Sequence, residues 1–161
     1  NQSLCDTPGF MVGPEAEGSG TVRHAYRMFT IAAKLEVPIF CIVLRKAYGL
    51  GSMAMAGGSM HAPFFCISWP TGEFGGMGLE GAVRLGYRKE LEAIEDPVKR
   101  EAVYEKMVAK AYRHGRAINT AAYLEIDEVI DPAESRAWIV KGLAANKGKG
   151  SSHSRGFVDT W

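Results

Sequence analysis

A glycine-rich turn between an apolar run and a segment of small residues is the part of this sequence best suited to chemistry. It contains Gly49, Leu50 and Gly51, directly before Ser52 and Met53. If a helix starts here, its first backbone N–H groups have no acceptor inside the helix and carry partial positive charge. Such donors can stabilise an oxyanion or an enolate without a charged side chain. The same pattern is common punctuation between a strand and a helix, so both interpretations stay open from the pattern alone.

The other reactive side chains form less complete patterns. Ser52 at a helix start is a candidate nucleophile, but a serine nucleophile needs a base within hydrogen-bond reach. His61 lies one short helix further along the chain, and no aspartate follows in a convincing pattern. The 4 histidines and 3 cysteines show no ligand spacing, so we expect no metal site.

Buried strands must position the turn. Residues 39–44 form a continuous apolar run, which is typical of a strand covered on both faces in a parallel sheet. Residues 64–68 form a second such run, and we expect the two strands to be adjacent and parallel, with a helix over 19–36 packed on their sheet. The other expected elements are a strand end at 1–6, a loop at 7–18, the turn at 45–51, a helix at 52–58, a glycine-rich stretch at 72–81, a short strand at 127–130, and helices that start at Asp96 and Asp131.

Length and composition favour one globular domain. The chain has 161 residues with a net charge of +1, so we expect no nucleic-acid binding. No apolar run approaches the roughly 20 residues of a membrane span. We predict a domain at 1–145 and a flexible tail at 146–161. The odd number of cysteines without a C-x-x-C motif indicates reduced thiols, and the N-terminus has no signal-peptide pattern, so we expect a cytoplasmic protein.

Six short motifs resemble those of the biotin-dependent carboxyltransferases, and they occur in the order found in that family. Residues 6–10 read D-T-P-G-F, which looks like a loop of that family. Residues 43–49 read V-L-R-K-A-Y-G, which is similar to the family's V-x-L-R-K-A-Y-G signature. The other motifs lie at 18–24, 69–73, 77–83 and 127–132. No single motif is specific, but the ordered set is.

The resemblance implies an α/β, crotonase-like fold of the ClpP/crotonase superfamily, with a mainly parallel sheet flanked by helices. The family carries this fold twice, and the chain resembles only the C-terminal half, which mainly receives biotin. The implied activity is carboxyl transfer between carboxybiotin and an acyl-CoA, with the backbone N–H groups of Leu50 and Gly51 as catalytic donors. The residues that the resemblance assigns to biotin or acyl-CoA binding are Phe10, Tyr48, Gly49 and Met53.

The implied cofactor is biotin on a separate carrier domain, and the implied substrate is a CoA ester. The implied partners are an N-terminal carboxyltransferase half, a biotin carboxyl carrier and a biotin carboxylase, within a homo-oligomer. Two alternatives stay open. One is a non-catalytic half-enzyme that binds CoA esters; the other is a Clp-like serine peptidase with Ser52, because Clp-type peptidases share the fold and carry Ser-Met at a helix start. The chain departs from acetyl- and propionyl-type enzymes at Met53, where they have an acid near the acyl pocket.

Overall fold

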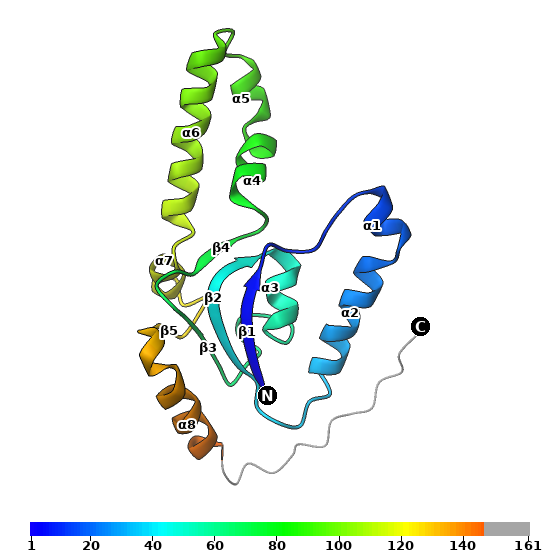
Figure 1. Cartoon of the computed structure of the whole chain (residues 1–161), viewed down its shortest axis with the longest axis vertical. Helices are drawn as coiled ribbons and strands as arrows, with labels where there is room; N and C mark the ends of the chain where they lie inside the picture. The colour runs from blue at the N-terminus through cyan, green and yellow to red at the C-terminus, as the bar shows by residue number, and fades with distance from the viewer. Residues whose placement is uncertain (147–161) are drawn as a thin grey trace.

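The computed structural model describes residues 1–146 and shows a parallel sheet with helices on both faces and a helical hairpin projecting from one end (Figure 1). The strand order is β1-β2-β3-β5, and β4 pairs with β2. Every pairing between these strands is parallel. The strands are β1 (Gln2–Thr7), β2 (Phe40–Tyr48), β3 (Phe65–Ser68), β4 (Glu73–Gly75) and β5 (Glu128–Val129).

The two apolar runs form adjacent parallel strands, which confirms that prediction. β2 and β3 pair with Phe40 opposite Phe65 and Cys41 opposite Cys66. Side chains alternate between the faces of a strand. One face of this pair therefore packs against Trp138 and neighbouring residues of α8 (Ser135–Ala145), and the other faces Met55 at the end of α3 (Gly49–Met55). Both faces are covered, as the continuous apolar runs predict.

β2 is longer than predicted. It continues through residues 45–48, which the sequence indicates as part of a turn. α3 follows directly and begins at Gly49, three residues before the predicted start at Ser52. The reason is β4, a strand inside the glycine-rich stretch, which pairs with the end of β2 at Lys46 opposite Glu73. Glycines lower β-propensity, so local sequence did not indicate this strand.

The N-terminal helices differ from the prediction. Pro14 starts a short helix, α1 (Pro14–Gly18), inside the predicted loop, since the first helical position tolerates proline. α2 (Thr21–Ala32) is shorter than the predicted helix over 19–36 and has no buried residue. The expectation that this helix packs on the sheet is wrong: its neighbours are α1 and α3, and α3 lies between it and the strands (Figure 1).

The predicted helix starts at Asp96 and Asp131 are confirmed. The Asp96 carboxylate accepts the N–H groups of Val98 and Lys99, at 2.9 and 3.3 Å, at the start of α6. Asp131 caps the 3₁₀ turn that leads into α8. The remaining helices are α4 (Leu79–Gly86), α5 (Arg88–Glu92), α6 (Pro97–His114), α7 (Ala117–Ala122) and the 3₁₀ helix η1 (Pro132–Glu134). The predicted tail at 146–161 lies outside the described residues except for Asn146, the C-cap of α8.

Candidate active site at the β2–α3 turn

The turn predicted to carry the chemistry lies where β2 ends and α3 begins. Tyr48 is the extended residue before the helix, and Gly49 is the first helical residue, with a φ of 56°. Residues other than glycine rarely adopt this left-handed backbone conformation. A β-carbon at Gly49 would also lie 2.8 Å from the carbonyl oxygen of Gly76. Gly49 therefore lets the segment after β4 approach the turn closely.

The D-T-P-G-F loop lies against the same turn. The register of β1 and β2 shifts between Cys5 and Thr7, and the chain leaves the sheet there. A β-carbon at Gly51 would lie 3.0 Å from the α-carbon of Gly9 and 3.1 Å from Oγ1 of Thr7. These distances are tighter than ordinary van der Waals contact. The loop and the turn thus touch at a point where neither backbone has room for an added side chain.

Asp6 fixes the start of this loop. Its Oδ1 accepts the backbone N–H of Lys46 at 3.0 Å, where the ladder between β1 and β2 is broken. Its Oδ2 pairs with the Arg45 guanidinium at 3.1 Å. The Lys46 hydrogen bond and then the Arg45 hydrogen bond lower the pKa of the Asp6 carboxyl. Asp6 and Arg45 belong to separate motifs of the sequence, and their pairing joins the loop to the strand that leads into the turn.

We expect this pair to make the fold sensitive to acid. Because the pKa of Asp6 is lower in the folded state, its stabilisation is present above the unfolded pKa, about 4, and is lost as the pH falls through the folded value. In a pH series of melting temperatures, Asp6→Asn should therefore lower stability at neutral pH and flatten the loss below about pH 4. Glu90→Gln, at an exposed position of α5, is the control and should leave the acid profile unchanged. An acid profile of Asp6→Asn that matches the unsubstituted chain would contradict this role.

The backbone amides of Leu50 and Gly51 lie at the start of α3. Leu50 and Gly51 lie in the first turn of α3, where an N–H has no acceptor one helical turn earlier. In the described part of the chain, neither amide donates any of the turn and loop hydrogen bonds. Leu50 is 58% exposed, whereas Gly51 is buried beneath the loop. The candidate donors are therefore backbone N–H groups and not charged side chains.

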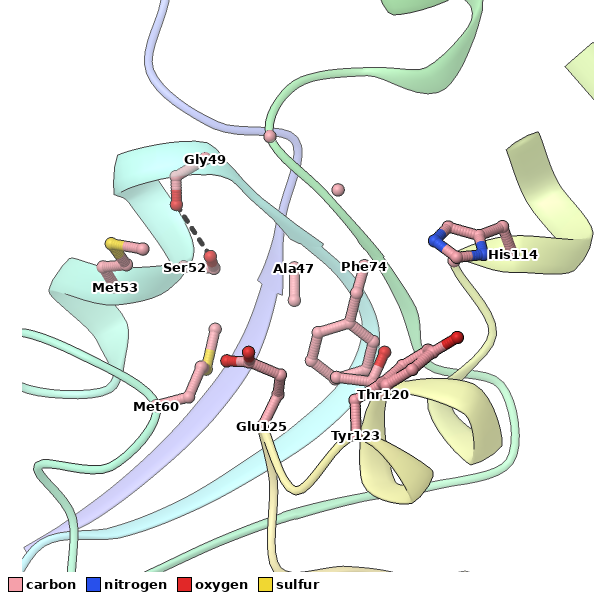
Figure 2. Close-up of a pocket in the computed structure, with 13 residues that line it drawn as sticks. Ala47, Gly49, Ser52, Met53, Met60, Phe74, His114, Thr120, Tyr123 and Glu125 are labelled. Atoms are coloured by element: carbon pink, nitrogen blue, oxygen red, sulfur yellow. Dashed lines mark hydrogen bonds between the residues drawn. The ribbon is translucent and has the colours of Figure 1, made fainter.

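A cavity of about 390 Å³ opens beside the turn. Figure 2 shows Ser52, Met53 and Met60 on one side of it, with His114 and Tyr123 on the other. Its wall is completed by Ala47, Gly49, Phe74, Gly75, Gly76, Gly115, Thr120 and Glu125. The apolar side is methionine-rich, and the polar groups come mainly from the end of α6 and from the segment after it. The cavity therefore has the mixed lining of a small-molecule site.

The structure brings some predicted site residues together and separates others. Gly49 and Met53 line the cavity, whereas Leu50 and Gly51, which lie between them in α3, do not. Phe10 is half-buried in the D-T-P-G-F loop. Tyr48 is only 3% exposed and does not line the cavity; its hydroxyl donates to Oε2 of Glu73 at 3.0 Å. Its side chain supports the turn from inside the fold.

Sequence reasoning missed the far wall of the cavity. His114, Thr120, Tyr123 and Glu125 lie more than 60 residues from the turn in sequence. No local spacing connects them with Gly49, because β4 and α7 bring them to the turn through tertiary contacts. Phe74 lies on the same wall and directly follows the W-P-T-G-E motif, so sequence could indicate it as a pocket residue.

The geometry does not prepare Ser52 as a nucleophile. Ser52 is 3% exposed, and its hydroxyl donates to the carbonyl of Gly49 at 2.8 Å. His61 does not line the cavity; its Nε2 lies 3.9 Å from a carboxylate oxygen of Glu125, and both side chains are mostly exposed. Within residues 1–146, no hydrogen bond joins Ser52 to a histidine. A peptidase needs that contact to activate its serine.

Two searches of the described residues bear on other classes of protein. Residues 1–146 contain no cluster of three or more histidine, cysteine or carboxylate side chains arranged to hold a metal ion. None of the helices in that range combines the length and the hydropathy of a membrane-spanning segment. All three cysteines are free and buried, as the composition predicts.

Comparison with known proteins gives a consistent family. A family model described as the carboxyl transferase domain matches residues 3–155. The methylmalonyl-CoA carboxyltransferase 12S subunit of Propionibacterium freudenreichii subsp. shermanii is 37% identical over 144 residues, covering 87% of this chain and 26% of that protein. The propionyl-CoA carboxylase carboxyltransferase subunit of Haloferax mediterranei is 34% identical over 151 residues, covering 93% of this chain and 28% of that protein. The chain thus spans about a quarter to a third of the curated relatives it matches, between 26% and 32% of their length.

Solved structures confirm the fold. A single-chain, multi-domain long-chain acyl-CoA carboxylase is 58% identical, with a TM-score of 0.75 over 87% of this chain and 13% of that one. A transcarboxylase 12S structure with methylmalonyl-CoA and methylmalonic acid bound is 31% identical, with a TM-score of 0.84 over 98% of this chain and 30% of that one. The α/β crotonase-like fold expected from the motifs is therefore confirmed. With the family model extending over residues 3–155 and the family's motifs meeting at one turn, the chain belongs to the biotin-dependent acyl-CoA carboxyltransferases.

Proposed function

We propose that this chain supplies the biotin-side half of an active site that transfers a carboxyl group between carboxybiotin and an acyl-CoA. The observation that carries the proposal is the meeting of three backbone segments at the turn: the loop at Gly9 lies against Gly51, and the segment at Gly76 lies against Gly49, which lines the cavity. These segments lie in or beside motifs of the family. At the turn they bring backbone groups of all three segments close together.

The chemistry of the reaction fits such a site. Carboxyl transfer passes through anionic oxygens, on an enolate of the acyl group or on the ureido ring of biotin, and each is stabilised by preorganised hydrogen-bond donors. In this proposal the N–H groups of Leu50 and Gly51 donate to one such oxygen. Carboxybiotin on its carrier would supply the carboxyl group. Gly49 keeps the turn open to the ligand. Met53 gives the cavity an apolar side at the position where acetyl- and propionyl-type enzymes of the family have an acid.

Ser52 distinguishes this proposal from the peptidase alternative. In a mixture of the chain with an N-terminal carboxyltransferase half, a carboxylated biotin carrier and an acyl-CoA, Ser52→Ala should change the rate of carboxyl transfer only modestly, because the hydroxyl bonds to its own turn. A fluorophosphonate probe should not label Ser52. Stoichiometric labelling of Ser52, together with loss of peptide hydrolysis in Ser52→Ala, would establish the peptidase instead. Turnover by the mixture also separates the enzyme from a half-protein that only binds CoA esters.

The proposed partners include another carboxyltransferase surface. α2 and the segment after it expose large apolar side chains, including Val22, Tyr26, Ile31 and Val37. A second cavity, of about 320 Å³, lies at the base of this helix against Asn1–Ser3. Exposed apolar surface of this extent is typical of an interface. We infer that it is covered in a homo-oligomer with N-terminal halves, and that a biotin carboxyl carrier and a biotin carboxylase serve the same assembly. Cytoplasmic localisation stays a prediction.

Light scattering tests the assembly. The chain should have a solution mass above that of a monomer at micromolar concentration. Ile31→Glu, on the exposed face of α2, should shift the mass toward the monomer because it places a charge in the apolar surface. Val98→Glu is the matched control, because Val98 is 78% exposed and belongs to α6, an element that lies apart from α2 (Figure 1). A clean monomer for the unsubstituted chain would count against the interface.

A further inference from the structure

Tyr48 connects the start of α3 to a carboxylate. It is both the last residue of β2 and the residue at the N-cap position of α3, and it is 3% exposed. Its hydroxyl donates to Oε2 of Glu73 at 3.0 Å. Burial and this hydrogen bond raise the pKa of the Tyr48 phenol, so the hydroxyl keeps its proton and remains a donor at neutral pH. The ring is therefore held at its polar end as well as by packing.

Glu73 is itself fixed from two sides. The Glu73 backbone pairs with Lys46 of β2 in the parallel ladder, and it forms an isolated antiparallel bridge with Arg116. The flanking residues repeat this arrangement, since the N–H of Phe74 donates to Gly115 at 2.7 Å and the N–H of Ala117 donates to Gly72 at 3.0 Å. The carboxylate thus projects from a short strand clamped between β2 and the α6–α7 junction.

The position of Tyr48 sets the position of the turn. The peptide after Tyr48 leads directly into Gly49 and Leu50, and a β-carbon on Gly9 would lie 3.4 Å from the Tyr48 carbonyl oxygen. A shift of the Tyr48 ring would therefore move both the first helical residues and their contact with the D-T-P-G-F loop. Misplacement of donors by a small distance is enough to weaken stabilisation of a transition state.

We propose that Glu73 is a positioning residue of the active site, which acts through the Tyr48 hydroxyl to hold the first turn of α3 in place. The inference rests on the proposed function for its effect on turnover, but the effect on the turn itself is independent of any substrate. Neither side chain needs to touch the ligand. Glu73 gives the turn a rigid link to the α6–α7 wall of the same cavity.

The chain offers a matched control for the loss of a tyrosine hydroxyl. Tyr104 of α6 lies beneath the Arg84 guanidinium, which is 4.7 Å from the ring centroid, and this contact joins α6 to α4 within the projecting hairpin. Tyr104→Phe removes a partly buried phenol oxygen without altering β2, β4 or the turn. Tyr112 is a poorer control, because its hydroxyl donates to Glu80 at 2.6 Å and lies close to the Tyr48 hydroxyl.

The test measures the turn and the rate separately. Hydrogen–deuterium exchange over residues 46–56 should become about tenfold faster in Tyr48→Phe, which corresponds to loss of a hydrogen bond to a charged group. In the reconstituted mixture the same variant should lower kcat about tenfold with little change in KM for acyl-CoA. Tyr104→Phe should change neither quantity. Glu73→Gln keeps an acceptor oxygen and should retain more of the kcat than Glu73→Ala.

Three outcomes overturn the inference. One is a Tyr48→Phe chain whose exchange over 46–56 matches that of Tyr104→Phe. Another is a lowered melting temperature with unchanged exchange and unchanged kcat, which marks a merely structural bond. The third is equal loss in Glu73→Gln and Glu73→Ala. If the unsubstituted mixture shows no carboxyl transfer, the proposed function fails, but the exchange experiment still decides whether Glu73 holds the turn.

Discussion

The isolated chain should show little or no carboxyl transfer, and addition of an N-terminal carboxyltransferase half should restore it. The relatives that it matches are roughly three times as long, and the match covers between 26% and 32% of their length. By the resemblance, the second oxyanion site and most CoA contacts belong to the other half. Loss of a single oxyanion donor costs about 10²–10³ in rate, so the absence of a whole donor site should cost at least that.

The assay supplies a carboxylated biotin carrier as the carboxyl donor. Chromatography then measures how much carboxylated acyl-CoA is formed with and without the N-terminal half. A suitable N-terminal half comes from the long-chain acyl-CoA carboxylase that is 58% identical to this chain. That half alone is the necessary control and should be equally inactive. Robust turnover by the 161-residue chain without it would refute the half-site proposal.

Leu50→Pro should lower the rate of the reconstituted enzyme by about 10²–10³, whereas Leu50→Ala should leave much of it. Both substitutions remove the same exposed side chain, but only proline removes the backbone N–H. The first turn of a helix accepts proline, so the fold should survive, and circular dichroism and the melting temperature verify this. A well-folded Leu50→Pro enzyme with full activity would eliminate the Leu50 amide as a catalytic donor.

Gly51→Pro removes the second donor, but it needs a steric control. Any side chain at Gly51 meets Gly9 at 3.0 Å, so part of the loss in Gly51→Pro comes from displacement of the D-T-P-G-F loop. Gly51→Ala introduces the same β-carbon and keeps the N–H. The difference between these two variants, rather than the loss in Gly51→Pro alone, measures what the Gly51 amide contributes.

The placement of Tyr48 changes the interpretation of the V-L-R-K-A-Y-G motif. Family resemblance suggests that the tyrosine contacts a ligand, but the structure places its ring inside the fold, bonded to Glu73. Arg45 of the same motif is committed to Asp6. Both side chains therefore act on the geometry of neighbouring backbone segments. The proposed chemistry belongs to the backbone that follows the motif, where Leu50 and Gly51 lie in the first turn of α3.

Sequence alone determined the elements whose signals are local. The apolar runs at 39–44 and 64–68 predicted β2 and β3 and their parallel pairing, because a strand buried on both faces needs apolar side chains at every position. Asp96 and Asp131 marked helix starts because a carboxylate directly satisfies the free N–H groups of the first turn. The ordered motifs also identified the family and the turn between β2 and α3.

Tertiary structure decided the features that depend on distant contacts. β4 exists because the end of β2 offers an edge to a glycine-rich segment whose own propensity does not favour a strand. α2 has a helical pattern, but whether it packs on the sheet depends on α3, which occupies the intervening place. The far wall of the cavity and the bond from Tyr48 to Glu73 bring residues of the β2–α3 turn together with residues more than 20 positions away. A one-dimensional pattern records the period of a helix or strand, whereas these contacts depend on how the elements meet in space.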